Sequence, residues 1–163
     1  MKYQVAIETV DEQPIAASRQ RTTFDRIARE IGNLLGHSWA FLKERSELRR
    51  DGHNVAIYWD ERDQGSIEVG VQVVARFEAT DRVVCSATPG GRVARTAHFG
   101  PYSELILAHR AVREWCRENG HELVLPFWEV YGDWDDDPAK VRTDVYYLLK
   151  QGPAGTTVPP SRW

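Results

Sequence analysis

The alternation of apolar and polar positions predicts one series of structural elements and then predicts it again. Alternating positions predict strands over residues 3–10 and 15–21. Apolar residues three and four apart then predict a helix that runs to about Arg49. We expect Asp51-Gly52 to end it, because glycine tolerates the left-handed conformation after a helix. The first half therefore opens with strand, strand and helix.

Two strands are expected to complete the first half, over residues 54–59 and 67–75, with a turn at 62–65. The later strand has the clearest half-buried pattern in the chain. Its valines and isoleucine alternate with Glu68, Gly70 and other residues, so one face is expected to be buried and the other exposed.

The second half repeats the order of strand, strand, helix, strand and strand. Gly120-His121 follows the second helix as Gly52-His53 follows the first. The predicted elements are strands at 83–87 and 93–99, a helix opened by Gly100-Pro101 and stopped at Gly120, and strands at 123–132 and 142–149.

The repeated order predicts an α+β fold. Duplicated β-β-α-β-β units form an eight-stranded, antiparallel-rich sheet with two long helices on one face. We expect one domain over residues 1–150, with pseudo-repeats at about 3–77 and 82–149. Residues 151–163 are rich in proline and glycine and are expected to form a flexible C-terminal tail.

Composition and charge narrow the function classes. The chain has 163 residues, 42% of them hydrophobic and 28% charged, with a formal net charge of -3. This charge and the lack of a basic stripe argue against direct nucleic-acid binding. No apolar run approaches the roughly 18 residues that cross a bilayer, and the N-terminus has no signal-peptide pattern. We therefore expect a cytoplasmic protein without a membrane partner, in which Cys85 and Cys116 are free thiols.

A set of residues, mainly in the second half, carries a resemblance to a known family. These residues are Gly91-Arg-Val-Ala-Arg-Thr-Ala-His98-Phe99-Gly100-Pro101-Tyr102, Leu105, Trp115, Gly120, Trp128-Glu129-Val130-Tyr131, Asp137-Pro138 and Arg142-Thr143-Asp144-Val145-Tyr146, with a weaker match at Ile57-Tyr58-Trp59-Asp60. In this order and spacing they resemble the GyrI-like superfamily, also known as the AraC-type transcription activator effector-binding domain.

The resemblance implies a pseudo-symmetric fold whose two halves enclose a groove for lipophilic, often cationic, small molecules. A buried glutamate at the position of Glu129 would meet the ligand's positive charge, and aromatic side chains would line the walls. Some relatives are fused to a helix-turn-helix regulator, some inhibit gyrase, and some hydrolyse cyclopropane-bearing genotoxins. We expect no DNA-binding domain within this sequence, because the resemblance begins within its first few residues.

The residues themselves favour the same site. Side chains alternate along a strand, so Phe127, Glu129 and Tyr131 share one face and Trp128 lies on the other. A carboxylate between two rings can pair with a cation, and each ring adds cation–π attraction. The alternative is an exposed strand glutamate paired with an arginine.

Other candidate ligand-binding residues each have a structural alternative. By pseudo-symmetry, Tyr58 or Trp59 faces the groove, or else packs in the core. Trp39 fits the core and the groove equally. Tyr102 either reaches the pocket or anchors the start of the second helix, and His109 is either a core histidine or a base in the pocket. The histidines lack metal-ligand spacing, so we expect neither metal nor cofactor.

Three functions follow. The first is a standalone binding protein for lipophilic or cationic small molecules, with Glu129 supplying the charge. The second is a hydrolase of electrophilic, cyclopropanoid-type compounds, in which Glu129 activates water and Tyr131 or Tyr58 stabilises the oxyanion. The third and weakest is a protein partner of DNA gyrase or of a regulator.

Overall fold

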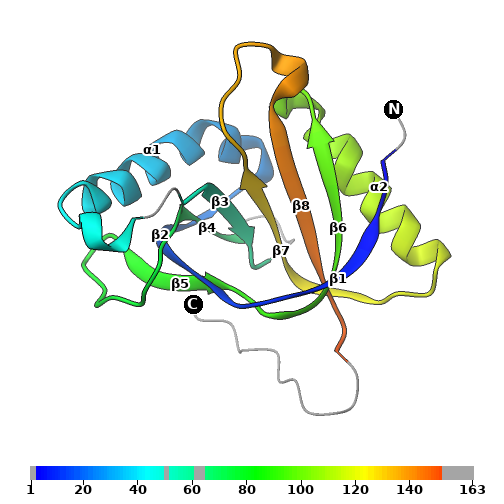
Figure 1. Cartoon of the computed structure of the whole chain (residues 1–163), viewed down its shortest axis with the longest axis horizontal. Coiled ribbons are helices and arrows are strands. Elements are labelled where there is room, and N and C mark those ends of the chain that lie inside the picture. The colour runs from blue at the N-terminus through cyan, green and yellow to red at the C-terminus, as the bar shows by residue number, and fades with distance from the viewer. Residues whose placement is uncertain (1–2, 50–51, 61–64, 152–163) are drawn as a thin grey trace. The chain divides into compact units, whose positions relative to one another are not determined.

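The computed structural model describes residues 3–49, 52–60 and 65–151. They contain eight strands and two α-helices, with three short 3-10 turns (Figure 1). The strands are β1 (Ala6–Val10), β2 (Gln13–Thr22), β3 (Asn54–Tyr58), β4 (Gly65–Gln72), β5 (Val84–Thr88), β6 (Gly91–Phe99), β7 (Leu123–Tyr131) and β8 (Arg142–Leu149). The helices are α1 (Phe24–Lys43) and α2 (Leu105–Glu118), and the 3-10 turns are η1 (Ser46–Leu48), η2 (Tyr102–Glu104) and η3 (Pro138–Lys140).

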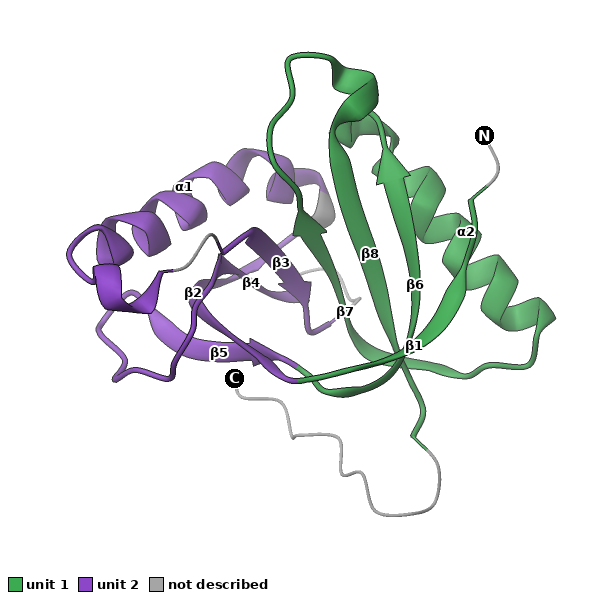
Figure 2. Ribbon diagram, viewed as in Figure 1, with its two compact units in different colours: residues 1–11, 89–163 green, residues 12–88 purple. Residues whose placement is uncertain are grey.

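The predicted fold class is confirmed: the chain is α+β, and each described strand pairing is antiparallel. The chain divides into two compact units, unit 1 with residues 1–11 and 89–163 and unit 2 with residues 12–88 (Figure 2). Each unit holds four strands and one α-helix.

Unit 2 builds its core between α1 and its strands. Its strand order is β3-β4-β2-β5, and α1 contacts β2 and β4. Apolar positions of the helix and of the turn after it therefore meet apolar positions of the sheet, as the three- and four-residue spacing requires. The buried cluster consists of Ala16, Phe41, Leu42, Leu48, Val71, Val73 and Val83.

Unit 1 repeats this architecture with the strand order β1-β6-β8-β7, and α2 contacts β6 and β8. The helix buries one stripe, which consists of Leu105, Ala108, His109, Val112 and Cys116. The first strand of each half pairs outside its own half, because β1 pairs with β6 and β5 pairs with β2. The two halves of the sequence therefore exchange their first strands, and each exchanged strand lies within the unit that it pairs with.

The end of the first helix differs from the prediction. Helix α1 ends at Lys43, and the chain turns through η1 so that Leu48 packs into the core. Gly52 is not a helix cap: a Cβ there would lie 2.1 Å from the backbone oxygen of Gln72, so its role is close packing. Asp51 lies outside the described residues, as does most of the predicted tail.

The half-buried pattern predicted for β4 is also wrong. The strand is buried on both faces from Gly65 to Val71, and Glu68 is only 1% exposed. One face meets α1, and on the other Glu68 is covered by hydrogen-bonding side chains from β2, β5 and the residue after β3. Alternation alone cannot distinguish a solvated polar face from a polar face that is buried and paired.

The remaining expectations concern the cysteines and the membrane. Cys85 and Cys116 are both free thiols, as predicted, and burial raises the pKa of Cys116. In the described part of the chain, no helix is long and apolar enough to cross a membrane.

Two glycines provide a matched test of this packing. A Cβ at Gly70 would lie 2.0 Å from the backbone oxygen of Ala16, whereas a Cβ at Gly32 in α1 meets nothing within 4 Å. We expect Gly70→Ala to lower the free energy of unfolding by about 1–3 kcal/mol or more. Gly32→Ala should raise it by up to about 1 kcal/mol, because alanine is the better helix former. Urea unfolding measures both, and equal effects would contradict the packing described for β2 and β4.

Candidate functional site

The candidate site lies in unit 1, where α2 packs against the sheet. Glu129 pairs with Val145 across β7 and β8, and the glutamate is only 6% exposed. It is therefore a buried carboxylate and not the exposed, arginine-paired strand glutamate of the alternative interpretation. A buried carboxylate requires hydrogen-bond donors, because transfer from water without them is strongly unfavourable.

Two side chains supply those donors. Nε2 of His109 lies 2.8 Å from Oε1 of Glu129, and the hydroxyl of Tyr131 donates to Oε2 at 2.5 Å. His109 is on α2, while Tyr131 is two residues further along β7 and on the same face, as strand alternation predicts. Each carboxylate oxygen thus accepts one hydrogen bond from the protein.

The hydrogen bonds continue away from Glu129 in one direction. Nδ1 of His109 lies 2.6 Å from the hydroxyl of Tyr147, and Nε of Arg113 donates to the same hydroxyl at 3.1 Å. Either ring nitrogen of a histidine can donate, so these contacts define the partners and not the tautomer. An unbroken series of polar contacts therefore joins Arg113 through Tyr147 and His109 to Glu129.

Aromatic rings surround this chain of hydrogen bonds. Phe127 and Tyr147 stack with centroids 4.9 Å apart at 12°, and His109 meets both edge-on at 5.6 Å. The guanidinium carbon of Arg113 lies 5.6 Å from the Phe127 centroid and 5.3 Å from the Tyr147 centroid. Trp128 stacks on Tyr146 at 5.3 Å and lies on the opposite face, as predicted.

Tyr102 lies at the exposed side of the site. Its ring meets the edge of Tyr131 at 5.6 Å, and 47% of the residue is exposed. Of the predicted site residues, the structure thus brings together Glu129, Tyr131, Phe127, His109 and Tyr102 within unit 1. His109 is buried in the helix stripe, as a core histidine would be, and it also bonds Glu129; its role as a base stays a prediction.

The corresponding hairpin of unit 2 lacks the carboxylate. One backbone hydrogen bond follows the last described residue pair in each hairpin. In the β3–β4 hairpin, the amide of Trp59 donates to the carbonyl of Ser66; in the β7–β8 hairpin, the amide of Gly132 donates to the carbonyl of Arg142. Counted back from these bonds, Tyr58 corresponds to Tyr131, and the buried Ala56 corresponds to Glu129. The tyrosine is therefore present in both hairpins, and the acid only in that of unit 1.

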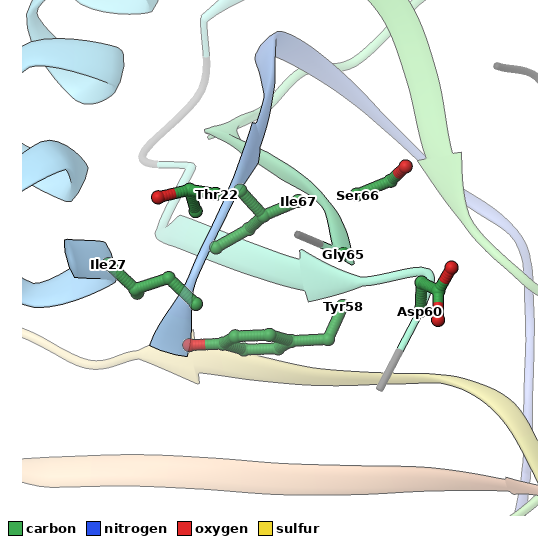
Figure 3. A pocket seen from close by; sticks show the side chains of 7 residues that line it. All are labelled: Thr22, Ile27, Tyr58, Asp60, Gly65, Ser66 and Ile67. Atoms are coloured by element: carbon green, nitrogen blue, oxygen red, sulfur yellow. The ribbon is translucent and has the colours of Figure 1, made fainter. Parts of the chain in front are cut away.

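Tyr58 lines a small open hollow in unit 2 (Figure 3). Its other lining residues are Thr22, Ile27, Asp60, Gly65, Ser66 and Ile67, from β2, α1, β4 and the residues around the end of β3. The hollow has room for little more than one water molecule, whereas pockets for drug-sized ligands measure about 300–1,000 Å³, so it is too small to hold such a ligand by itself.

Trp59 and Trp39 have hydrogen-bond partners within unit 2. The indole of Trp59 donates to Glu68 Oε1 at 2.5 Å, and Ser86 donates to the same oxygen at 2.6 Å. Trp39 donates to Asn54 at 2.9 Å and packs against the unit's core. Contact of either tryptophan with a ligand stays a prediction.

Sequence reasoning missed several polar residues of these networks. Tyr147 and Arg113 complete the chain to Glu129, and Arg19 forms an ion pair with Glu68 at 3.2 Å. A signal existed for one of them: Arg113 follows His109 by four residues and so lies beside it on the helix. The partners of Tyr147 and Glu68 come from distant segments that local patterns do not connect.

No metal centre is formed by the residues that the structure describes, since none of their His, Cys, Asp and Glu side chains gather in groups of three or more that could hold an ion. His98, which the family resemblance includes, lies 2.8 Å from the hydroxyl of Tyr3 and 3.1 Å from the carbonyl of Pro101. It therefore joins the N-terminal segment to the start of η2.

Comparison with known families identifies the class. The GyrI-like small molecule binding domain matches residues 3–150, which is nearly the whole chain. The chain therefore belongs to the GyrI-like small-molecule-binding family, as its resemblance predicted.

Solved structures support the fold. The C-terminal domain of EcmrR is 20% identical, with a TM-score of 0.77 over 93% of this chain and 100% of that one. SAV2435 bound to tetraphenylphosphonium is 12% identical, with a TM-score of 0.60 over 92% of this chain and 94% of that one. A hydrolase from Listeria innocua is 14% identical, with a TM-score of 0.60 over 91% of this chain and 93% of that one. At these identities the likeness shows the fold alone. Comparison with curated proteins gave no match.

Removal of one hydroxyl tests the hydrogen-bond chain. Tyr147→Phe deprives Nδ1 of His109 and Nε of Arg113 of the hydroxyl that both bond. We expect a loss of about 1–3 kcal/mol in the free energy of unfolding, because a buried polar group is left unpaired. Tyr102→Phe is the matched control and should change stability by less than about 0.5 kcal/mol, since that residue is half exposed. Similar losses in both variants, measured by urea unfolding, would argue against the chain.

Proposed function

We propose that this protein binds lipophilic cationic small molecules, with Glu129 as the counter-charge. The observation that carries the proposal is a carboxylate that is 6% exposed and is held by His109 and Tyr131 among aromatic rings. A cation attracted to this carboxylate encounters low polarity and therefore weak screening, which strengthens the attraction.

The carboxylate retains capacity for a ligand. Each of its oxygens can accept about two hydrogen bonds, and His109 and Tyr131 each use one. A ligand cation can therefore approach Glu129 while the protein's own hydrogen bonds persist. These bonds hold the carboxylate in place before binding, which lowers the entropy lost on association.

Aromatic rings extend from the surface toward the charge. Tyr102 is half exposed, its ring touches Tyr131, and Tyr131 donates to Glu129. A flat or multi-ring cation could stack along this series, gaining apolar burial and cation–π attraction together. We propose Phe127, Tyr131, Tyr102 and His109 as ligand contacts from unit 1, and retain Tyr58, Trp59 and Trp39 of unit 2 as predicted contacts. A gyrase or regulator partner likewise stays a prediction from the family resemblance.

Charge removal at Glu129 tests this function. We expect Glu129→Gln to weaken the binding of tetraphenylphosphonium about 10- to 100-fold, which corresponds to about 1–3 kcal/mol. Isothermal titration measures the affinity, and a thermal melt establishes that the variant is folded. Glu114→Gln, at an exposed position on α2, removes the same charge and should leave the affinity within about twofold. Equal effects of the two variants, or no binding by the wild type, would refute the proposed function.

Hydrolysis is the second candidate function, and the 2.8 Å contact between His109 and Glu129 supports it. A carboxylate bonded to a histidine can hold a water molecule and accept its proton. The single hydroxyl proton of Tyr131 goes to Glu129, so Tyr131 would have to turn away from the carboxylate to stabilise an oxyanion. The electrophile would be a strained or otherwise activated small molecule.

Turnover distinguishes this alternative from simple binding. If the protein is a hydrolase, it will open a cyclopropane-bearing alkylator faster than buffer does, and Glu129→Gln will lower the rate about 100-fold or more. Chromatography of the ring-opened product measures the rate. A wild-type rate equal to that of buffer, or equal rates for wild type and variant, would eliminate Glu129 as a catalytic base.

A further inference from the structure

The protein's own cation already lies against the aromatic rings of the candidate site. The guanidinium carbon of Arg113 is beside the stacked pair of Phe127 and Tyr147, 5.6 and 5.3 Å from the two centroids. Both distances fall within the roughly 6 Å over which a cation is attracted to a ring. A ligand cation would seek the same ring faces.

We propose that Arg113 is a resident cation of the ligand site and determines how strongly the site prefers positively charged ligands. The proposal rests on the function proposed above and adds the element that regulates its selectivity. In the unliganded protein, the guanidinium serves as an internal substitute for the ligand's charge. A bound cation takes over the ring pair, and the arginine must withdraw from it.

The polar contacts of Arg113 connect it to the carboxylate. Its Nε donates to Tyr147, whose hydroxyl bonds His109, and His109 in turn bonds Glu129. The positive and negative ends of the site therefore belong to one hydrogen-bonded chain. Arg113 thus places a positive charge within the same series of contacts as the carboxylate, which weakens the attraction of the site for a further cation.

The position of Arg113 on α2 allows such a withdrawal. The residue is exposed, whereas His109, one turn before it, is buried. A long arginine side chain that starts from an exposed helix position can change rotamer without disturbing the core. The ring pair beneath it stays stacked, since Phe127 and Tyr147 are both buried.

Two ligands separate charge from shape. Tetraphenylphosphonium carries one positive charge on an aromatic framework, and triphenylphosphine oxide is a neutral compound with three of the same rings. We expect Arg113→Gln to bind tetraphenylphosphonium about three- to tenfold tighter than wild type, because a like charge is removed and the rings become accessible. Its affinity for the neutral compound should change by less than about twofold.

Two further variants complete the experiment. Arg113→Lys keeps the positive charge but loses the planar guanidinium, so it should bind the phosphonium ion less tightly than Arg113→Gln and Arg113→Ala do. Arg117→Gln, one turn further along α2 and also exposed, removes the same charge and should likewise have little effect. Arg113→Ala is a second neutral variant and should bind as Arg113→Gln does.

The outcomes distinguish this inference from the proposed function. If wild type binds the phosphonium ion through Glu129 but Arg113→Gln and Arg113→Ala bind it no tighter, only the resident-cation proposal is overturned. An equal gain in Arg117→Gln would overturn it too, because net charge would then explain the effect. If neither wild type nor Arg113→Gln binds the ion, both proposals are wrong.

Discussion

The site depends on the pairing of one buried carboxylate. Glu129 is withdrawn from water by the packing of α2 on unit 1, and such burial is tolerable only with donors in place. His109 and Tyr131 supply them, and Tyr147 and Arg113 in turn complete the partners of His109. The geometry of the helix against the sheet is thereby coupled to the electrostatics of the ligand site.

The two halves share the same order of strands and helix, and they differ at the single positions that carry the polar chemistry. The two hairpins share their register and the tyrosines Tyr58 and Tyr131, but Ala56 stands where the other half has Glu129. Unit 2 also contains a buried acid, Glu68, but its oxygens accept from Trp59, Ser86 and Arg19. Two buried carboxylates in one fold thus have different surroundings: Glu68 is paired with an arginine, and Glu129 with a histidine, a tyrosine and aromatic rings.

Much of the fold and part of the site follow from local patterns. The order of eight strands and two helices was predictable because periods of two and of three to four residues are properties of the chain itself. The same period placed Phe127, Glu129 and Tyr131 on one face, opposite Trp128. The end of α1 and the burial of Glu68 were predicted wrongly, since both depend on what the remainder of unit 2 places against them.

The sequence by itself determined the class of fold, its repeated order and the face of β7 that carries the carboxylate. Only the tertiary structure decided which side chains complete that carboxylate's environment. Tyr147 reaches His109 from β8, 38 positions away, and Arg113 reaches the ring of Phe127 from α2. Hydrogen bonds and cation–π contacts act only over a few ångströms. The number of residues between two positions does not determine their distance in space, which is set only when the helix and the strands pack together.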